Sequence, residues 1–191
     1  MPPPDPDPAA LAAQLQPERP LPPVDRWNPP FSGDMDLRIA RDGTWYHEGA
    51  PFQREALVRL FASILRRDED GHHYLVTPVE KWRIRVDNAP FVAVRLDAVG
   101  EGADRSLSFT TNVGDTVIAG PDHPLIVEYR EPGGEPAPYI QVRGGLRALL
   151  SRAVFVDLIE LGEERAGSSD RCYGVWSRGQ FFRLGRLDDD T

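Results

Sequence analysis

The stretch that most constrains this chain runs from Gly71 to Phe91 and reads GHHYLVTPVEKWRIRVDNAPF. It holds two runs with the composition of strands, His72–Thr77 and Trp82–Asp87. Pro78, which lacks an N–H group, separates the two runs, and Asn88-Ala89-Pro90 closes the second. A helical pattern precedes this stretch and a series of short strand-like runs follows it. We therefore expect it to carry the chain from one half of the fold to the other.

The segment before this stretch combines a hairpin with an amphipathic helix. Strand-like residues on either side of Asp42-Gly43, a pair that favours a tight turn, predict a hairpin over residues 37–47. Between residues 53 and 67, apolar residues recur at the spacing of one helix face: Leu57, Leu60, Phe61, Ile64 and Leu65. Arg66 and Arg67 would end this helix, where the helix dipole favours cations. The acidic run Asp68–Gly71 then predicts a solvated turn.

The segment after Pro90 has the pattern of antiparallel β structure. Short runs rich in Val, Ile, Phe or Tyr alternate with clusters of Gly, Asp, Asn and Pro, which is typical of a meander. The predicted strands are Phe91–Ala98, Ser106–Thr110, Asp115–Ala119, Leu125–Arg130 and Pro138–Val142.

Two further elements complete the pattern. From Gly144 to about Glu163, apolar residues recur at helical spacing, which predicts a helix that is either buried on most of its surface or broken near Arg152. A final hairpin pairs Tyr173–Trp176 with Phe181–Leu184.

Two short segments of the chain are similar to each other. The residues from Trp45 to Phe52 and those from Val175 to Phe182 share a bulky pair, two polar residues, a glycine and a phenylalanine three positions on. Each segment lies beside a helical pattern. The similarity indicates two related hairpin-and-helix units, although a repeat this short also arises by chance.

Charge and composition argue against several classes of function. The 191 residues carry 30 acidic and 22 basic side chains, a net charge of −8, which argues against nucleic acids and membranes as partners. Cys172 is the sole cysteine, so we expect neither an internal disulfide nor a Cys-based zinc site. The sequence has no apolar run of membrane-spanning length, and we expect a cytoplasmic protein.

Proline dominates the N-terminal segment, since 11 of the 19 prolines fall within residues 1–30. Fixed φ angles and missing N–H groups disfavour helix and strand there. We expect an extended or disordered arm that Trp27 and Phe31 pin to the body; a proline-rich recognition tail is the alternative. The chain then divides into this arm, an N-terminal α+β domain (31–90), a β-rich C-terminal domain with a helix (91–187) and an acidic tail (188–191).

Short motifs from Trp27 to Val154 carry a resemblance to a known family. They are Trp27-Asn28-Pro29-Pro30, Ile39–Trp45, His47-Glu48-Gly49, Leu57–Phe61, Leu75–Lys81, Val86-Asp87, Ala89–Phe91, Arg143–Leu146 and Arg152–Val154. Together they resemble domain-of-unknown-function family 1285, and Thr-Pro-Val-Glu-Lys at 77–81 is the most specific part. The resemblance implies uncharacterised bacterial proteins of two small α+β domains with an internal repeat. It also implies a C-terminal half like a pleckstrin-homology-like barrel plus helix, no established activity, a nucleotide-like ligand at the domain interface and a signalling role.

No motif of an enzyme or of a nucleotide-binding loop is present. The sequence lacks a Gly-x-Gly-x-x-Gly after a strand, a Walker loop, Gly-x-Ser-x-Gly and His-Glu-x-x-His. His72 and His73 would point to opposite faces of a strand, which disfavours a metal site. We therefore expect no catalytic residue, no metal and no cofactor, which favours a protein that is not an enzyme without deciding the question.

Arg143-Gly144-Gly145 is the first candidate site. It lies where a predicted strand meets the start of a predicted helix, and Arg147 follows one turn into that helix. Free N–H groups at a helix N-terminus attract anions, glycine leaves room for the approach, and arginine strengthens the attraction. The alternative is a plain tight turn with surface arginines.

Glu80 and Lys81, with Asp87, form the second candidate site. Charged residues within so apolar a segment either pair with one another or line a cleft, and both interpretations stay open. An enzyme would use Glu80, Asp87 or His47 as its acid or base.

These patterns predict a two-domain α+β protein that acts as a non-enzymatic sensor or binding module. Its ligand would be a small anionic, nucleotide-like molecule held between the domains, where pockets are common. Two alternatives stay open, an enzyme in the same cleft and a protein-interaction scaffold without a ligand. An arginine-lined pocket would favour the ligand, and a carboxyl or histidine with a shifted pKa near a nucleophile would favour the enzyme. An exposed apolar patch would favour the scaffold.

Overall fold

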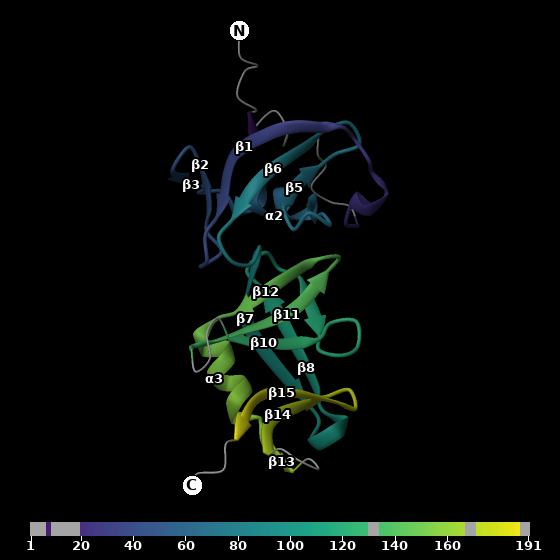
Figure 1. Ribbon diagram of the computed structural model, residues 1–191, viewed down its shortest axis with the longest axis vertical. Coiled ribbons are helices and arrows are strands. Elements are labelled where there is room, and N and C mark those ends of the chain that lie inside the picture. The colour runs from purple at the N-terminus through teal and green to yellow at the C-terminus, as the bar shows by residue number, and fades with distance from the viewer. Residues whose placement is uncertain (1–6, 9–19, 130–133, 167–170, 188–191) are drawn as a thin grey trace. The chain divides into compact units, whose positions relative to one another are not determined.

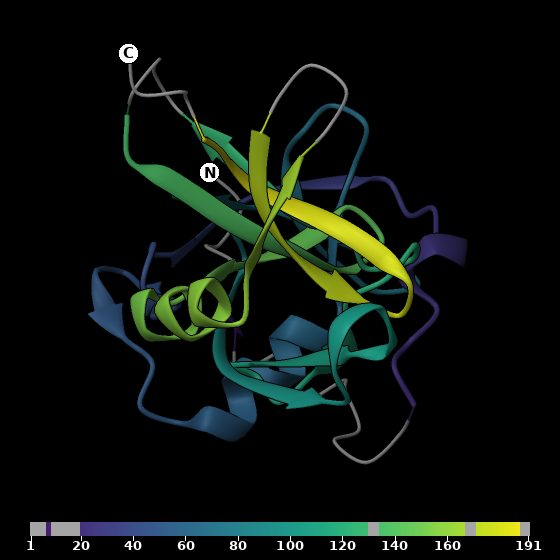
Figure 2. The ribbon, with the colours of Figure 1, turned by 90° about the horizontal axis from the view of Figure 1, so that it is seen from below.

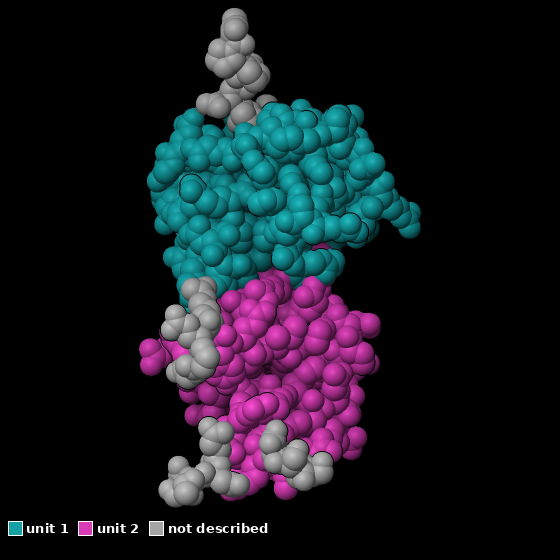
Figure 3. Space-filling model, in the orientation of Figure 1, with its two compact units in different colours: residues 1–90, 144–146 teal, residues 91–143, 147–191 magenta. Residues whose placement is uncertain are grey.

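The computed structural model describes residues 7–8, 20–129, 134–166 and 171–187 in two compact units (Figures 1 and 3). Unit 1 comprises residues 1–90 and 144–146, and unit 2 comprises residues 91–143 and 147–191. The expectations for most of the arm (1–6 and 9–19) and for the acidic tail (188–191) lie outside the described residues.

Unit 1 is built on a six-stranded sheet with the order β3-β2-β1-β6-β5-β4. Its strands are β1 (Phe31–Ile39), β2 (Trp45–His47), β3 (Ala50–Pro51), β4 (Leu65–Arg67), β5 (His73–Val76) and β6 (Lys81–Val86). The first and last strands, β1 and β6, pair in parallel, whereas the other pairs are antiparallel. A short 3-10 turn, η1 (Val24–Arg26), precedes the sheet, and helix α2 (Glu55–Ser63) connects β3 to β4.

The core of unit 1 lies between this sheet and helix α2. Side chains of a strand alternate between the two faces of a sheet, and Met35 and Leu37 of β1 are buried while Asp36 between them is exposed. The Phe61 ring of α2 stacks on Trp45 of β2 with their centroids 6.2 Å apart. Phe61 is fully buried, as the spacing of apolar residues predicts.

The predicted helix over residues 53–67 is wrong at its C-terminal end. Helix α2 ends at Ser63, and residues 65–67 form β4, which pairs with β5 so that Leu65 lies opposite Leu75. Leu65 is buried as part of the sheet, and Arg66 and Arg67 do not lie at a helix end. Hydrogen bonds to β5 replace those of a further helical turn, and the apolar spacing fits both arrangements.

Unit 2 contains a second six-stranded sheet, with the order β10-β11-β12-β7-β8-β9. Its strands are β7 (Phe91–Val99), β8 (Ser106–Thr111), β9 (Thr116–Ile118), β10 (Leu125–Tyr129), β11 (Pro136–Arg143) and β12 (Leu146–Leu150). A 3-10 turn, η2 (Gly102–Asp104), connects β7 to β8. The five strands predicted after Pro90 are confirmed as β7 to β11.

A helix and a three-stranded sheet complete unit 2. Helix α3 (Arg152–Glu160) packs against β7 and β14, and the small sheet has the order β13-β14-β15. Its strands are β13 (Glu163–Ala166), β14 (Arg171–Ser177) and β15 (Gln180–Leu187), of which the last two confirm the predicted hairpin. The yellow β14–β15 hairpin crosses the green strands in Figure 2, and β15 runs against β10, where the Tyr129 hydroxyl donates to the Leu184 carbonyl at 3.2 Å.

The predicted helix over residues 144–163 is wrong in its first half. Leu146–Leu150 form β12, which pairs in parallel with β7. The break predicted near Arg152 is confirmed, because Ser151 ends the strand and its hydroxyl accepts the Val154 N–H at 3.3 Å as a helix N-cap. The helix is not buried on most of its surface, since Val156 and Ile159 are exposed.

The two six-stranded sheets share one topology. Numbered from the first strand of each unit, both have the order 3-2-1-6-5-4 with a parallel pair between strands 1 and 6. In this scheme the counterpart of β2–β3 is β8–β9. The similarity between residues 45–52 and 175–182 instead relates β2–β3 to β14–β15. That similarity reflects a shared turn, since Glu48-Gly49 (φ 49°, 78°) and Arg178-Gly179 (φ 50°, 77°) have the positive φ pair of tight hairpins.

Strands predominate in both units, in agreement with the α+β class. The likeness of the C-terminal half to a pleckstrin-homology domain stays a prediction. Within the described ranges, neither α-helix is long and apolar enough to cross a membrane.

Candidate functional site

The candidate anion site at Arg143-Gly144-Gly145 is a turn between two strands. It joins β11 to β12, and helix α3 begins only at Arg152, so the helix N-terminus on which the prediction rested is absent. The Arg143 guanidinium donates to the carboxylate of Asp115 and lies over the Phe91 ring, 5.0 Å from its centroid. A carboxylate of its own chain thus neutralises the charge of Arg143. A ligand role for Arg143, Gly144 and Gly145 stays a prediction, but neither a helix N-terminus nor an available guanidinium supports it.

Arg147 lies on strand β12, not on a helix, and it too is engaged within unit 2. The two terminal nitrogens of its guanidinium donate to the two oxygens of the Glu128 carboxylate, at 2.5 and 3.3 Å. The guanidinium carbon lies 3.8 Å from the centroid of the Tyr139 ring. A bidentate ion pair over an aromatic face satisfies the charge and orients the guanidinium plane.

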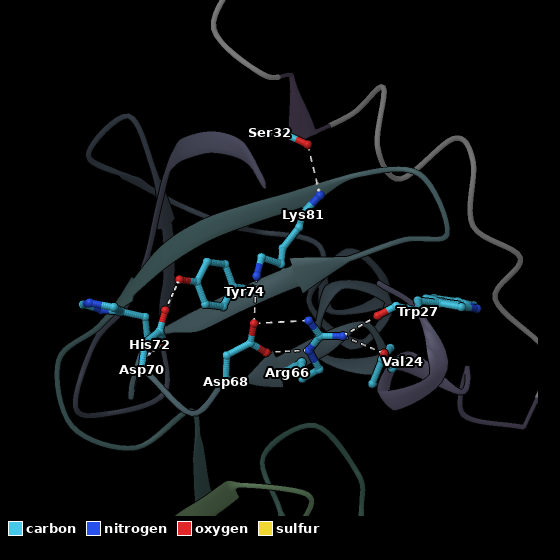
Figure 4. Close-up of polar contacts among 9 residues, drawn as sticks. All are labelled: Val24, Trp27, Ser32, Arg66, Asp68, Asp70, His72, Tyr74 and Lys81. Atoms are coloured by element: carbon cyan, nitrogen blue, oxygen red, sulfur yellow. Dashed lines mark hydrogen bonds and ion pairs between the residues drawn. The ribbon is translucent and has the colours of Figure 1, made fainter. Parts of the chain in front are cut away.

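Lys81 belongs to a cluster of ion pairs on one face of the unit 1 sheet (Figure 4). Its ammonium donates to Asp68 at 2.9 Å and lies 4.5 Å from the centroid of the Tyr74 ring. The Arg66 guanidinium donates to both oxygens of the same carboxylate, at 2.6 and 3.2 Å. Burial raises the pKa of Asp68, but hydrogen bonds from Arg66 and Lys81 outweigh it, so the pKa lies below its ordinary value.

Arg66 also fixes the segment that precedes the sheet. Its remaining terminal nitrogen donates to the backbone carbonyls of Val24, the first residue of η1, at 2.9 Å and of Trp27, the residue after η1, at 2.7 Å (Figure 4). The sequence predicts that Trp27 and Phe31 pin this segment, but Phe31 is 54% exposed, and its ring contacts only side chains of the sheet, edge-to-face with Tyr74 and 5.8 Å below the Arg83 guanidinium. Carbonyl groups held by one arginine therefore anchor the base of the arm.

Tyr74 closes the cluster on its other side (Figure 4). Its hydroxyl donates to Asp70 at 2.6 Å, and this bond raises the pKa of Tyr74 to about 12 and lowers the pKa of Asp70. The turn predicted at residues 68–71 is present, but Asp68 and Asp70 are bonded into the sheet. The feature of the sequence that could have revealed this cluster is the position of the two acids, which lie between a strand with Arg66 and a strand with Tyr74.

Asp87 and His47 lie on opposite faces of the sheet. Asp87 accepts from Arg38 at 2.6 Å, and Arg38 lies over the Tyr46 ring. His47 follows Tyr46 in β2, so it points to the other face, where it stacks on Phe52 with centroids 6.2 Å apart. Asp87 is also about 20 Å along β6 from Lys81 at the strand's usual rise. The candidates within unit 1 therefore do not converge on one catalytic point.

Glu80 belongs to a rigid turn between β5 and β6. Thr77, 2% exposed, accepts the N–H groups of Val79 (3.3 Å) and Glu80 (3.0 Å) through its hydroxyl, and its own N–H donates to the Glu80 carbonyl at 2.9 Å. Pro78 fixes a further φ angle. This locked turn holds Val79 in solvent, 66% exposed.

A second exposed apolar side chain lies at the same end of the sheet. The parallel pairing of β1 and β6 sets Phe31 beside Lys81, which directly follows the turn. Pro30 and Pro78 are exposed next to Phe31 and Val79. We call these four residues, Pro30, Phe31, Pro78 and Val79, the tip surface.

No metal-binding group of three or more His, Cys, Asp or Glu side chains occurs among the residues that the structure describes. The carboxyl groups with a lowered pKa are bound by hydrogen-bond donors: Asp34 by Arg83, Asp42 by Thr44, Asp68 by Arg66 and Lys81, and Asp70 by Tyr74. A lowered pKa keeps a carboxyl ionised, which is the opposite of what a general acid requires.

The chain is thus a two-unit α+β protein that uses one sheet topology twice, and Lys81, Asp87, Arg143 and Arg147 among its candidate residues are engaged in ion pairs. Two family models cover these units. The model for the N-terminal domain of unknown function DUF1285 matches residues 22–89, and the model for the C-terminal domain of the protein of unknown function DUF1285 matches residues 90–184. The protein belongs to the DUF1285 family.

Two solved structures are similar to this chain. A DUF1285 family protein from Silicibacter pomeroyi is 49% identical, with a TM-score of 0.88 over 96% of this chain and 97% of that one. A DUF1285 family protein from Shewanella baltica is 25% identical, with a TM-score of 0.51 over 65% of this chain and 91% of that one. No curated protein matches the chain.

Proposed function

We propose that this protein is a non-enzymatic interaction protein that binds a partner protein through the tip surface of unit 1. The observation that carries the proposal is the rigid turn at residues 77–80, which holds the apolar side chain of Val79 66% exposed. Of the alternatives that the sequence leaves open, an exposed apolar patch favours the scaffold without a small ligand.

The turn lowers the entropic cost of binding. A loop that must be ordered on association loses conformational freedom, which subtracts from the affinity. Three hydrogen bonds to Thr77 and the ring of Pro78 already fix this loop in the free protein. Burial of side chains the size of Val79 and Phe31 contributes roughly 1.5–3 kcal/mol each.

The partner is expected to offer an apolar pocket with a basic rim. Glu80 follows Val79 directly and is half-buried at the edge of the tip surface. The neighbouring cations are engaged, since Lys81 is bound to Asp68 and Arg83 to Asp34. A basic group beside the partner's pocket would therefore complement the carboxylate of Glu80.

The ion pairs of the candidate residues weaken the case for a small anionic ligand. Arg143 and Arg147 would each have to leave a carboxylate, Asp115 or Glu128, before either could bind a nucleotide-like molecule. Breaking such a pair exposes a second charge and reduces the gain from the new contact. We therefore favour binding of a partner protein over the two other hypotheses, a small ligand with a signalling role and an enzymatic activity.

Site-specific photo-crosslinking tests the proposal. A photoreactive amino acid at position 79, in protein expressed in the native host, should form one dominant product with another protein. Excess unlabelled wild-type protein should suppress the product, whereas excess Val79→Asp protein should not. The matched control carries the photoreactive group at Val99, which is 73% exposed in unit 2 and should give no such product.

Three outcomes would overturn the proposal. The first is the absence of any product at position 79, and the second is equal competition by the Val79→Asp protein once its melting temperature is shown to match the wild type. The third is a nucleotide or phosphorylated metabolite that raises the melting temperature of the wild type but not of an Arg143→Ala variant. That result would restore the small anionic ligand, because a ligand that binds only the native state stabilises it by RT ln(1 + [L]/Kd).

A further inference from the structure

The segment Pro20-Leu21-Pro22-Pro23, which we call the proline segment, lies at the base of the N-terminal arm. Proline fixes its own φ near −65°, and a residue that precedes a proline avoids the α region. Leu21 and Pro22 both precede a proline, so stereochemistry alone favours the polyproline II conformation here. That helix has three residues per turn, which sets Pro20 and Pro23 on one edge.

The proline segment is accessible in the structure. Pro20 and Pro23 are exposed, Leu21 is 51% exposed, and Pro22 is half-buried. Pro23 itself has φ −78° and ψ 62°, a turn conformation in which the Val24 N–H donates to the Pro22 carbonyl at 2.8 Å. The chain therefore turns sharply where the segment ends.

A fixed anchor follows immediately after the segment. Arg66 of β4 donates to the carbonyls of Val24 and Trp27 and is held in place by both oxygens of Asp68. The side chain of Arg66 is only 14% exposed. The anchored carbonyl of Val24 directly follows Pro23, so the proline segment projects from a rigid base.

We propose that the proline segment is a binding site for a proline-recognition domain, whose groove is lined by aromatic rings. Such grooves accept proline rings that repeat every three residues, and the preformed polyproline II helix loses little entropy on binding. The chemistry fits this partner better than a second sheet edge, because Pro20, Pro22 and Pro23 offer no N–H groups to a β-ladder. This site shares no residue with the tip surface, so either proposal can fail without the other.

Titration of the full-length protein with a purified SH3 domain that binds P-x-x-P peptides tests the inference. We expect saturable binding by isothermal calorimetry, weakened about tenfold or more in a Pro20→Ala, Pro23→Ala double variant, since each ring fills one pocket of the groove. The control is Pro51→Ala, an exposed proline of strand β3, which should bind like the wild type.

Two results would overturn the inference: no measurable binding of the SH3 domain, or equal affinity of the double variant. Pro23 adjoins the anchored turn, so the single variant Pro20→Ala is measured as well, and its unchanged melting temperature shows that the fold is intact. Equal affinity of Pro20→Ala and the wild type would also contradict the proposal.

Discussion

The two units have similar six-stranded sheets, but different elements cover them. Both contain a six-stranded sheet in the order 3-2-1-6-5-4 with a central parallel pair. Unit 1 places its helix, α2, between the third and fourth strands, whereas unit 2 places α3 after the sixth strand and adds the sheet β13-β14-β15. A shared strand order therefore does not fix where the covering helix lies in the sequence.

Polar contacts also differ between the units. In unit 1, the outer face of the sheet carries the cluster of Arg66, Asp68, Tyr74 and Lys81, and the carboxyl groups with a lowered pKa belong to this unit. In unit 2, the β14–β15 hairpin is attached through backbone groups, the Tyr129 hydroxyl and the buried hydroxyl of Ser177. Ser177, 0% exposed, accepts the Leu107 N–H at 3.1 Å and donates to the Ala119 carbonyl at 2.7 Å. Both units contain ion pairs, but only unit 2 adds a second layer of sheet.

The largest expected effect tests whether helices α2 and α3 contribute equally to the hydrophobic cores of their units. Phe61 of α2 and Leu158 of α3 are both 0% exposed. Phe61→Ala should lower the free energy of unfolding by about 3–5 kcal/mol and Leu158→Ala by about 2–5 kcal/mol, through lost transfer energy and a residual cavity. Arg59→Ala, whose side chain is 62% exposed on α2, should cost less than about 1 kcal/mol in the same urea titration. A small effect of either core variant would mean that its helix does not form the core of its unit.

The added sheet of unit 2 provides the next test. A Cβ at Gly174 would lie 2.3 Å from the Phe182 carbonyl oxygen and 2.6 Å from the Phe181 ring, and a backbone atom cannot rotate away. Gly174→Ala should therefore destabilise by about 1–3 kcal/mol, as overpacking does, and hydrogen exchange should show the loss in β14 and β15. The control is Gly185→Ala on the same hairpin, where the nearest atom is the Tyr129 hydroxyl at an ordinary 3.6 Å. Equal melting temperatures for the two variants would show that the hairpin adapts without strain.

The smallest expected effect is a loss of stability at low pH, which should begin in unit 1 before unit 2. The folded-state pKa of Asp68 lies below its unfolded value, so its ionised form stabilises unit 1 above the unfolded pKa. That stabilisation is lost as the pH falls from about 4 through the lower folded pKa. Amide protection factors, measured from pH 5 downward and corrected for the intrinsic exchange rate at each pH, should therefore fall earlier in β4 to β6 than in β14 and β15. Asp68→Asn should remove part of this pH dependence, and earlier exchange in unit 2 would contradict the assignment.

Sequence patterns identified most strands but misjudged both helices at the point where helix and strand compete. The runs at 65–67 and 146–150 have apolar residues at spacings that fit a helix, yet they form β4 and β12. In both cases a neighbouring strand, β5 or β7, offers hydrogen-bond partners that are remote in sequence. A local pattern does not contain that information.

The candidate site shows the same limit. Arg143 and Arg147 were found as charged residues near glycines, but their partners Asp115 and Glu128 are 28 and 19 residues away in the chain. The sequence predicts that Asp68 is a solvated turn residue, whereas its contacts with Arg66 and Lys81 make it part of an ion-pair cluster. Residue type thus indicated where charge is concentrated but not whether that charge is already neutralised.

The sequence by itself determined the family, the strand-rich second half, the hairpin turns and the proline-rich arm, because these depend on residue order and on the local stereochemistry of glycine and proline. The tertiary structure alone decided the strand order that the two sheets share, the extent of each helix, and the pairing of Arg66, Arg143 and Arg147. Those features depend on contacts between residues far apart in the chain, and the free energy of such contacts is set only once the sheets have formed.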